Sequence, residues 1–150
     1  MGPSVLFVCT GNICRSPMAQ GLMEMRLAAR DLAAEVDSAG QHAVVGNSPE
    51  SAAIEAALEL GADISQQRAR SFQTSDFERF TNIIALDHGH LEFLKFMVPD
   101  HANVDIRLLL SGAPLGKDEV SDPFGRSLDV YRHTASLIAR GVESLIDEIF

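Results

Sequence analysis

Two cysteines and an arginine lie close together near the N-terminus, in the stretch Cys9-Thr10-Gly11-Asn12-Ile13-Cys14-Arg15-Ser16. A cysteine thiolate is a strong nucleophile, and an arginine guanidinium can donate two hydrogen bonds to one phosphate. Gly11 and Asn12 are the residue types that most readily adopt left-handed backbone conformations, which let successive N–H groups converge on an anion. The stretch predicts a phosphate-binding turn with Cys9 as nucleophile and Arg15 as clamp. Its phosphate-binding residues are Thr10, Gly11, Asn12, Ile13, Cys14, Arg15 and Ser16.

A second candidate is the dipeptide Asp122-Pro123. If Cys9 displaces an oxygen leaving group from phosphorus, a general acid should protonate that oxygen. Asp122 is the only carboxylate residue that directly precedes a proline, and the proline favours an extended backbone that presents the side chain from a loop. An ordinary Asp-Pro turn is the alternative interpretation.

Short apolar runs alternate with helical patterns along the chain. The predicted strands are residues 5–8, 34–38, 82–86 and 104–110, and the predicted helices are 16–31, 48–60, 91–97 and 130–149. Ser16-Pro17 and Ser48-Pro49 predict two helix starts, because serine caps helices and proline suits the first helical position. Residues 111–125 carry several glycines and prolines and predict a long loop.

This alternation predicts an α/β fold, a three-layer sandwich in which helices flank a four-stranded parallel sheet, with flavodoxin-like doubly wound topology. With 150 residues and no linker-like stretch, we expect one domain, residues 1–150. Parallel sheets bind ligands beyond the carboxyl ends of their strands. We therefore expect the Cys9 turn, the turn at Asp87 and the loop 111–125 to meet at that edge.

Composition limits the possible partners and compartments. The formal net charge of −9 argues against nucleic-acid binding and against anionic membrane surfaces. The apolar runs are too short to span a bilayer, and the N-terminus has no secretory pattern. Two closely spaced cysteines do not make a secreted disulfide framework, so we expect a cytoplasmic protein.

The stretch Cys9–Pro17 resembles the signature of the low-molecular-weight protein tyrosine phosphatases, Cys-(Thr/Leu)-Gly-Asn-(Ile/Ser)-Cys-Arg-Ser-Pro. The similarity extends to residues 37–40, 68–70, 84–87 and 122–123. It implies that Cys9 forms a phosphocysteine, Arg15 binds phosphate and Asp122 is the general acid. It also implies that Asn12 holds the turn and Ser16 supports the thiolate.

The resemblance further implies hydrolysis of phosphotyrosine and small aryl phosphates without a metal or cofactor. The substrate would be a tyrosine-phosphorylated protein, such as a bacterial tyrosine kinase, and the phosphatase a monomer or weak dimer. Two rival functions on the same scaffold are an arsenate reductase and a phosphocysteine carrier of a sugar transport system. The thioredoxin-coupled reductase needs a further cysteine pair, and a carrier needs no leaving-group acid. A non-enzymatic phosphate-binding module is a third rival.

Several positions depart from the family pattern. Many members have an aromatic residue in the loop after the second strand, where it forms a wall beside the substrate ring. This chain has Val44 there. With an aliphatic residue at this place, the chain resembles a bacterial subgroup linked to exopolysaccharide tyrosine kinases. Phe124 is the single aromatic after Asp122-Pro123, and it is either a substrate wall or a packing residue. Gln67 stands where a histidine commonly supports the asparagine of the turn.

Two further features allow alternative interpretations. Cys14 is either a redox partner that protects Cys9 by forming a disulfide or a small buried filler. His88-Gly89-His90 hints at a metal site, but no cysteine or carboxylate completes a ligand spacing, so we predict a solvated loop there and no metal.

Overall fold

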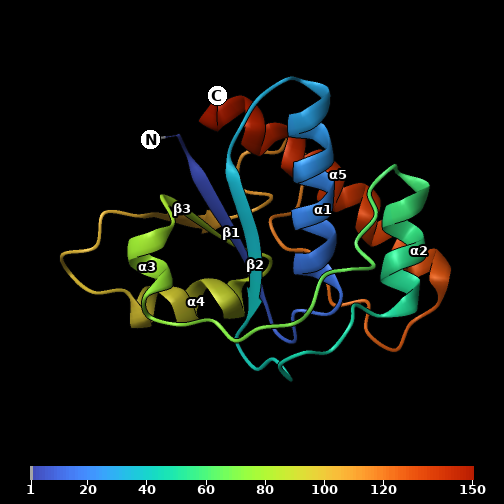
Figure 1. The fold of residues 1–150 in the computed structure, drawn as a ribbon, viewed down its shortest axis with the longest axis horizontal. Coiled ribbons are helices and arrows are strands. Elements are labelled where there is room, and N and C mark those ends of the chain that lie inside the picture. The colour runs from blue at the N-terminus through green and yellow to red at the C-terminus, as the bar shows by residue number, and fades with distance from the viewer. Residues whose placement is uncertain (1) are drawn as a thin grey trace.

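The computed structural model describes residues 2–150. At its centre lies a parallel four-stranded sheet with the order β2-β1-β3-β4 (Figure 1). Its strands are β1 (Ser4–Cys9), β2 (Glu35–Gly40), β3 (Asn82–Ala85) and β4 (Asp105–Leu108). The helices are α1 (Arg15–Ala29), α2 (Ser51–Glu59), α3 (Asp76–Arg79), α4 (His88–Met97) and α5 (Leu128–Ile149).

Both faces of the sheet are buried, which explains the continuous apolar run in β1. Val5 and Phe7 point into a core shared with α1, α2 and α5, whereas Leu6 and Val8 point into a second core with α3 and α4. The two groups of helices lie on opposite sides of the sheet in Figure 1. The predicted three-layer α/β architecture is confirmed.

The helix starts differ from the prediction. Helix α1 begins at Arg15 after Cys14, and Ser16 does not cap it, because its hydroxyl bonds to Cys9 and Asn12 instead. Helix α2 begins at Ser51 rather than at the Ser48-Pro49 pair. The four-residue helix α3 was not predicted, since one turn is too short to show a periodic pattern.

The three segments expected at the carboxyl edge of the sheet do meet there. Strand β1 has β2 on one side and β3 on the other, so the topological switch point lies between the carboxyl ends of β1 and β3. Cys9 ends β1, and Asp87 follows β3. Val120, in the loop 111–125, donates its N–H to Leu86 O at 2.8 Å and accepts from Arg15 Nη1 at 2.8 Å.

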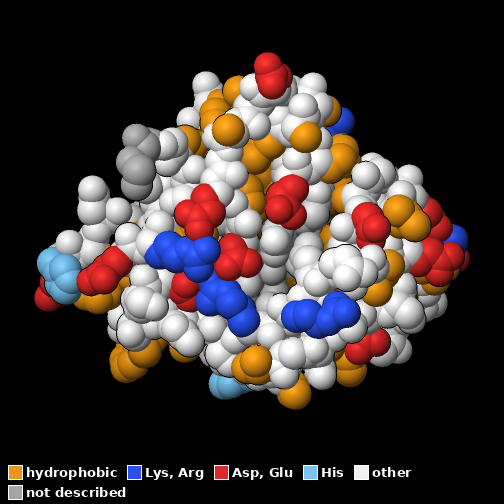
Figure 2. All heavy atoms as spheres, viewed as in Figure 1, with side chains coloured by type: hydrophobic (Ala, Val, Ile, Leu, Met, Phe, Trp, Pro, Cys, Tyr) orange, Lys and Arg blue, Asp and Glu red, His pale blue; other side chains and the backbone are white. Residues whose placement is uncertain are grey.

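Acidic side chains outnumber basic ones on the face shown in Figure 2, in keeping with the net charge. Some acidic residues of the chain form ion pairs: Glu35 pairs with Arg79, and Asp37 with Arg70. Within residues 2–150, no helix has both the length and the apolar character needed to cross a membrane.

Candidate active site

Cys9 ends β1 with its thiol buried against the first turn of α1. Its Sγ lies 2.9 Å from Ser16 Oγ, and Asn12 Nδ2 donates to the same Ser16 oxygen at 2.8 Å. Since Asn12 occupies a lone pair of the hydroxyl, the Ser16 hydrogen is left to point at Cys9. Ser16 is therefore arranged to donate to a Cys9 thiolate, a charge-assisted hydrogen bond.

Asn12 holds the turn in its conformation. It has a φ of +57° and is buried, and its amide also donates to Ser38 Oγ at 2.9 Å and accepts from the Arg70 N–H at 3.0 Å. The left-handed conformation expected of Asn12 is present, but Gly11 does not share it. Gln67 donates to Pro17 O at 3.0 Å and makes no hydrogen bond to Asn12.

The backbone of the turn offers donors for an anion. Within residues 2–150, no group accepts a hydrogen bond from the backbone N–H groups of residues 11–14. They lie immediately before the N-terminus of α1, where the helix dipole also favours negative charge. The turn is thus suited to bind the oxygens of a phosphoryl group.

Arg15 is almost fully buried, and its guanidinium is held by several acceptors. Nη1 donates to Asp87 Oδ2 at 2.8 Å and to Val120 O at 2.8 Å, and Nη2 lies 3.5 Å from Thr10 Oγ1. Burial alone would raise the pKa of Asp87, but hydrogen bonds from Arg15 and from the His90 N–H outweigh it, so the pKa is lowered. Asp87 therefore keeps the negative charge that orients Arg15.

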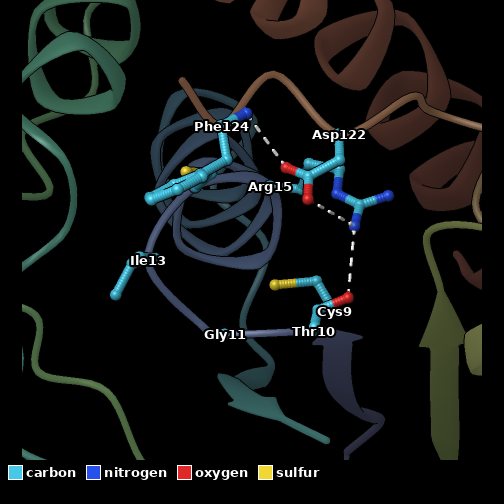
Figure 3. A pocket seen from close by; sticks show the side chains of 8 residues that line it. Cys9, Thr10, Gly11, Ile13, Arg15, Asp122 and Phe124 are labelled. Atoms are coloured by element: carbon cyan, nitrogen blue, oxygen red, sulfur yellow. Dashed lines mark hydrogen bonds and ion pairs between the residues drawn. The ribbon is translucent and has the colours of Figure 1, made fainter. Parts of the chain in front are cut away.

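Asp122 faces the cysteine from the loop 111–125 (Figure 3). Its side chain is 51% exposed, Oδ2 lies 3.8 Å from Arg15 Nη2, and Oδ1 accepts from the Phe124 N–H at 3.1 Å. The cavity between them has a volume of about 210 Å³. It is lined by Cys9, Thr10, Gly11, Ile13, Cys14, Arg15, Asp122 and Phe124.

The apolar walls of the cavity come from Ile13 and Phe124. Phe124 is 58% exposed, so the ring is available to a ligand rather than packed in the core. Val44 is 66% exposed and is not among the lining residues. Its role as a substrate wall stays a prediction.

Cys14 differs from Cys9 in its surroundings. Its Sγ lies 3.3 Å from the hydroxyl of the buried Tyr131, in α5. Burial raises the pKa of Cys14 to about 12, although the Tyr131 hydrogen bond acts in the opposite direction. Cys14 is therefore a protonated thiol at neutral pH, and neither cysteine forms a disulfide in this structure.

The prediction of a solvated loop at residues 88–90 was wrong, because these residues form the first turn of α4. Asp87 caps that helix by accepting from the His90 N–H at 3.0 Å. His88 is exposed and pairs with Asp118, but His90 is buried and its Nε2 lies 2.9 Å from Thr10 Oγ1. Sequence reasoning missed His90, since nothing in the sequence places it beside the turn.

The chain is similar to known phosphatases along nearly its whole length. Residues 4–150 match the family model of the low molecular weight phosphotyrosine protein phosphatases. A low molecular weight protein-tyrosine-phosphatase of Streptomyces coelicolor is 36% identical, over 95% of this chain and 90% of its own length. A low molecular weight phosphotyrosine phosphatase structure from Vibrio cholerae superposes with a TM-score of 0.92 at 33% identity, covering 98% of this chain and 96% of that one.

A third similar protein differs in substrate. The arginine phosphatase YwlE, in a variant with serine in place of the active-site cysteine, superposes with a TM-score of 0.88 at 26% identity, covering 97% of this chain and 94% of that one. In that structure the active-site serine is phosphorylated. Because the family model and the Streptomyces coelicolor relative both match nearly the whole chain, the chain belongs to the low molecular weight phosphotyrosine protein phosphatase family.

Proposed function

We propose that this protein hydrolyses phosphotyrosine and small aryl phosphates through a phosphocysteine on Cys9. One observation carries the proposal: Cys9, with Ser16 placed to stabilise its thiolate, faces Arg15 and Asp122 across one cavity. A nucleophile, an oxyanion clamp and a proton donor are what stepwise phosphate-ester hydrolysis needs.

In the first step, Cys9 Sγ attacks phosphorus and the bond from phosphorus to the phenolic oxygen breaks. The free N–H groups of the turn and Arg15 hold the equatorial oxygens, whose charge grows during the transfer. Asp122 gives its proton to the leaving phenolate. The products are the phenol, a phosphocysteine and the Asp122 carboxylate.

In the second step, Asp122 takes a proton from a water molecule as that water attacks phosphorus. The bond from phosphorus to sulfur breaks, inorganic phosphate forms, and Cys9 returns as a thiolate that accepts from Ser16. The serine phosphorylated at the cysteine position of YwlE supports an enzyme-bound phosphoryl group in this family. Asp122 is exposed enough for water to reach it.

The walls of the cavity favour an aromatic leaving group over phosphoarginine. Ile13 and Phe124 present apolar surface above the phosphate-binding turn, which suits a phenyl ring. A phosphoguanidinium group carries several N–H donors. Next to Ile13 and Phe124, which offer no acceptor, these donors would lose hydrogen bonds that they make in water. We therefore infer phosphotyrosine specificity.

The proposal extends to partners and compartment. A phosphotyrosine protein, such as a bacterial tyrosine kinase that phosphorylates itself, is the substrate. A thiolate nucleophile must stay reduced, so we propose a cytoplasmic location. Cys14 remains a proposed redox partner of Cys9. The arsenate reductase and phosphocysteine carrier are less favoured, because the chain has only two cysteines and Asp122 is placed to act on a leaving group.

The test compares phosphotyrosine, phosphoserine and phosphoarginine peptides as substrates for the wild type and Cys9→Ser. We expect phosphotyrosine to be hydrolysed with the highest kcat/KM and Cys9→Ser to lose at least about 10⁴-fold. Cys14→Ser is the matched control and should retain most of the activity. Full activity in Cys9→Ser would refute the role of Cys9 as nucleophile, and a preference for phosphoarginine would refute the substrate class.

A further inference from the structure

His90 closes a ring of polar groups beneath the phosphate-binding turn. Its Nε2 lies 2.9 Å from Thr10 Oγ1, and Thr10 Oγ1 lies 3.5 Å from Arg15 Nη2. Arg15 Nη1 donates to Asp87 Oδ2, and Asp87 Oδ1 lies 3.2 Å from His90 Nδ1. His90 and Arg15 are almost fully buried, whereas Thr10 is exposed and Asp87 is partly exposed.

The carboxylate of Asp87 decides which ring nitrogen of His90 carries the proton. Nδ1 faces Asp87 Oδ1 closely but without the geometry of a hydrogen bond, and it has no other partner within residues 2–150. A lone pair on Nδ1 would be repelled by the carboxylate, whereas an N–H is attracted to it. The neutral ring is therefore protonated on Nδ1, and Nε2 is an acceptor.

This assignment fixes the direction of the Thr10 hydroxyl. Because Nε2 accepts, the Thr10 hydrogen is donated to His90 and cannot turn toward the thiol or a phosphate oxygen. The Thr10 lone pairs then face Arg15 Nη2. We propose that His90 is a positioning residue that orients Thr10, and through Thr10 and Asp87 sets the guanidinium of Arg15 for phosphate binding. The inference rests on the proposed function of the same site.

The neutral form of His90 is also the form that the site favours. Burial lowers its pKa, as does the charge of Arg15, while the carboxylates of Asp87, Asp122 and Glu119 act in the opposite direction. The acceptor on Nε2 thus persists to a lower pH than it would in a free histidine. Protonation would convert Nε2 into a donor and break the orientation of Thr10.

The first experiment measures binding of inorganic phosphate by NMR titration at pH 7, which needs no turnover. His90→Phe fills the ring volume without an acceptor, and we expect it to weaken phosphate binding about tenfold. His90→Gln can place an amide oxygen near Thr10 and should recover most of the affinity. The exposed His133→Gln is the matched control. Equal phosphate affinity in the wild type and His90→Phe, at equal Tm, would overturn the proposal.

The second experiment is a double-mutant cycle between His90→Phe and Thr10→Val with an aryl phosphate substrate. Since the two residues act as one unit, kcat/KM of the double variant should be little lower than that of either single variant. If the two losses in kcat/KM multiply instead, the residues act independently and the proposal is contradicted. The loss in His90→Phe should not depend on the acidity of the leaving group. A wild type that binds phosphate but hydrolyses nothing would refute the proposed function, and the phosphate titration would still decide the role of His90.

Discussion

The turn at residues 9–16 and the loop 111–125 face each other across one cavity, but they are held by different means. Side chains of the turn are buried and bonded to distant segments, as Asn12 is to Ser38 and to the Arg70 N–H. The loop has no helix or strand, and Asp122 is half exposed. Among residues 2–150, its side chain accepts a hydrogen bond only from the N–H of its near neighbour Phe124.

Because of this difference, mutations in the turn and in the loop should affect stability and activity differently. The phosphate-binding turn shares its contacts with the core, so a change there should affect stability and activity together. A change at Asp122 removes no buried contact and should affect chemistry alone. Arg15 joins the two regions, since it contacts Asp87 and Val120 and lies 3.8 Å from Asp122.

The largest effect should come from Asp122→Asn, which keeps the shape of the loop but removes the proposed proton donor. We expect kcat/KM for phenyl phosphate, which reports the transfer to Cys9 and not the later hydrolysis, to fall at least about 10²-fold, because general acid catalysis contributes that much. For an ester with a very acidic phenol the loss should be far smaller, since its phenolate leaves without a proton. Steady-state kinetics over a series of substituted phenyl phosphates measures this.

The same variant tests the comparison between the two regions. Its free energy of unfolding should stay within about 0.5 kcal/mol of the wild type, as is usual for an exposed position. An equal loss of kcat/KM for all leaving groups would remove Asp122 from the role of acid. A large loss of stability would show that the loop is part of the core after all.

The next effect concerns Asn12 in the turn. Asn12→Ala removes two donated hydrogen bonds and one accepted bond. It also puts alanine, which tolerates a positive φ less well than asparagine does, at a φ of +57°, so the free energy of unfolding should fall by roughly 3 kcal/mol. Asn12→Gly tolerates the backbone conformation and should recover roughly 1 kcal/mol of this. Urea unfolding of the three proteins measures both values. Equal stability of the wild type and Asn12→Ala would mean that the turn holds its shape without the amide.

The same contrast explains what could be predicted from the sequence. The strands and most helices follow from periodicity, because both faces of the sheet are buried and alternate residues of β1 enter separate cores. The two Ser-Pro helix starts were predicted wrongly, since Ser16 bonds to the thiol and to Asn12 instead of capping α1. The hydrogen bonds of Ser16 with Cys9 and Asn12 thus take the place of the helix-capping bond that serine usually makes.

In the site, Cys9, Arg15 and Asp122 were predicted because they belong to short motifs. The turn at Asp87 and the loop that contains Val120 were expected at this edge, but their contacts with Arg15 were not predicted. His90 was missed altogether, because it reaches Thr10 only through the parallel packing of β1 and β3. Gly11 shows a further limit. Its type permits a left-handed backbone, but here only Asn12 in the turn adopts one.

A smaller effect should appear where the two regions meet, in the pH dependence of stability. The pKa of Asp87 is lowered in the folded protein. The charge of Asp87 therefore stabilises the fold at pH values above its unfolded pKa of about 4. This contribution is lost as the pH falls through the pKa of the folded protein. Asp87→Asn still caps α4 but lacks the charge, and it should cost roughly 2 kcal/mol at pH 7. The difference from the wild type should shrink at pH 3.

Urea unfolding at the two pH values measures this, with the exposed Asp118→Asn as control. The control should change the free energy of unfolding by less than about 0.5 kcal/mol at pH 7. A difference between Asp87→Asn and the wild type that is the same at both pH values would mean that Asp87 acts through its shape rather than its charge.

The smallest effect should separate the two predicted substrate walls. Phe124→Ala removes a ring that lines the cavity. We expect KM for phenyl phosphate to rise about fivefold and kcat to stay nearly unchanged. The reason is that the ring contacts the substrate equally in the ground state and in the transition state. Val44→Ala should change KM less than about twofold, because Val44 does not line the cavity. The two KM values decide between the walls. A larger rise in Val44→Ala would mean that the loop after β2 closes over the ring, and the site would then have a third region beside the turn and the loop 111–125.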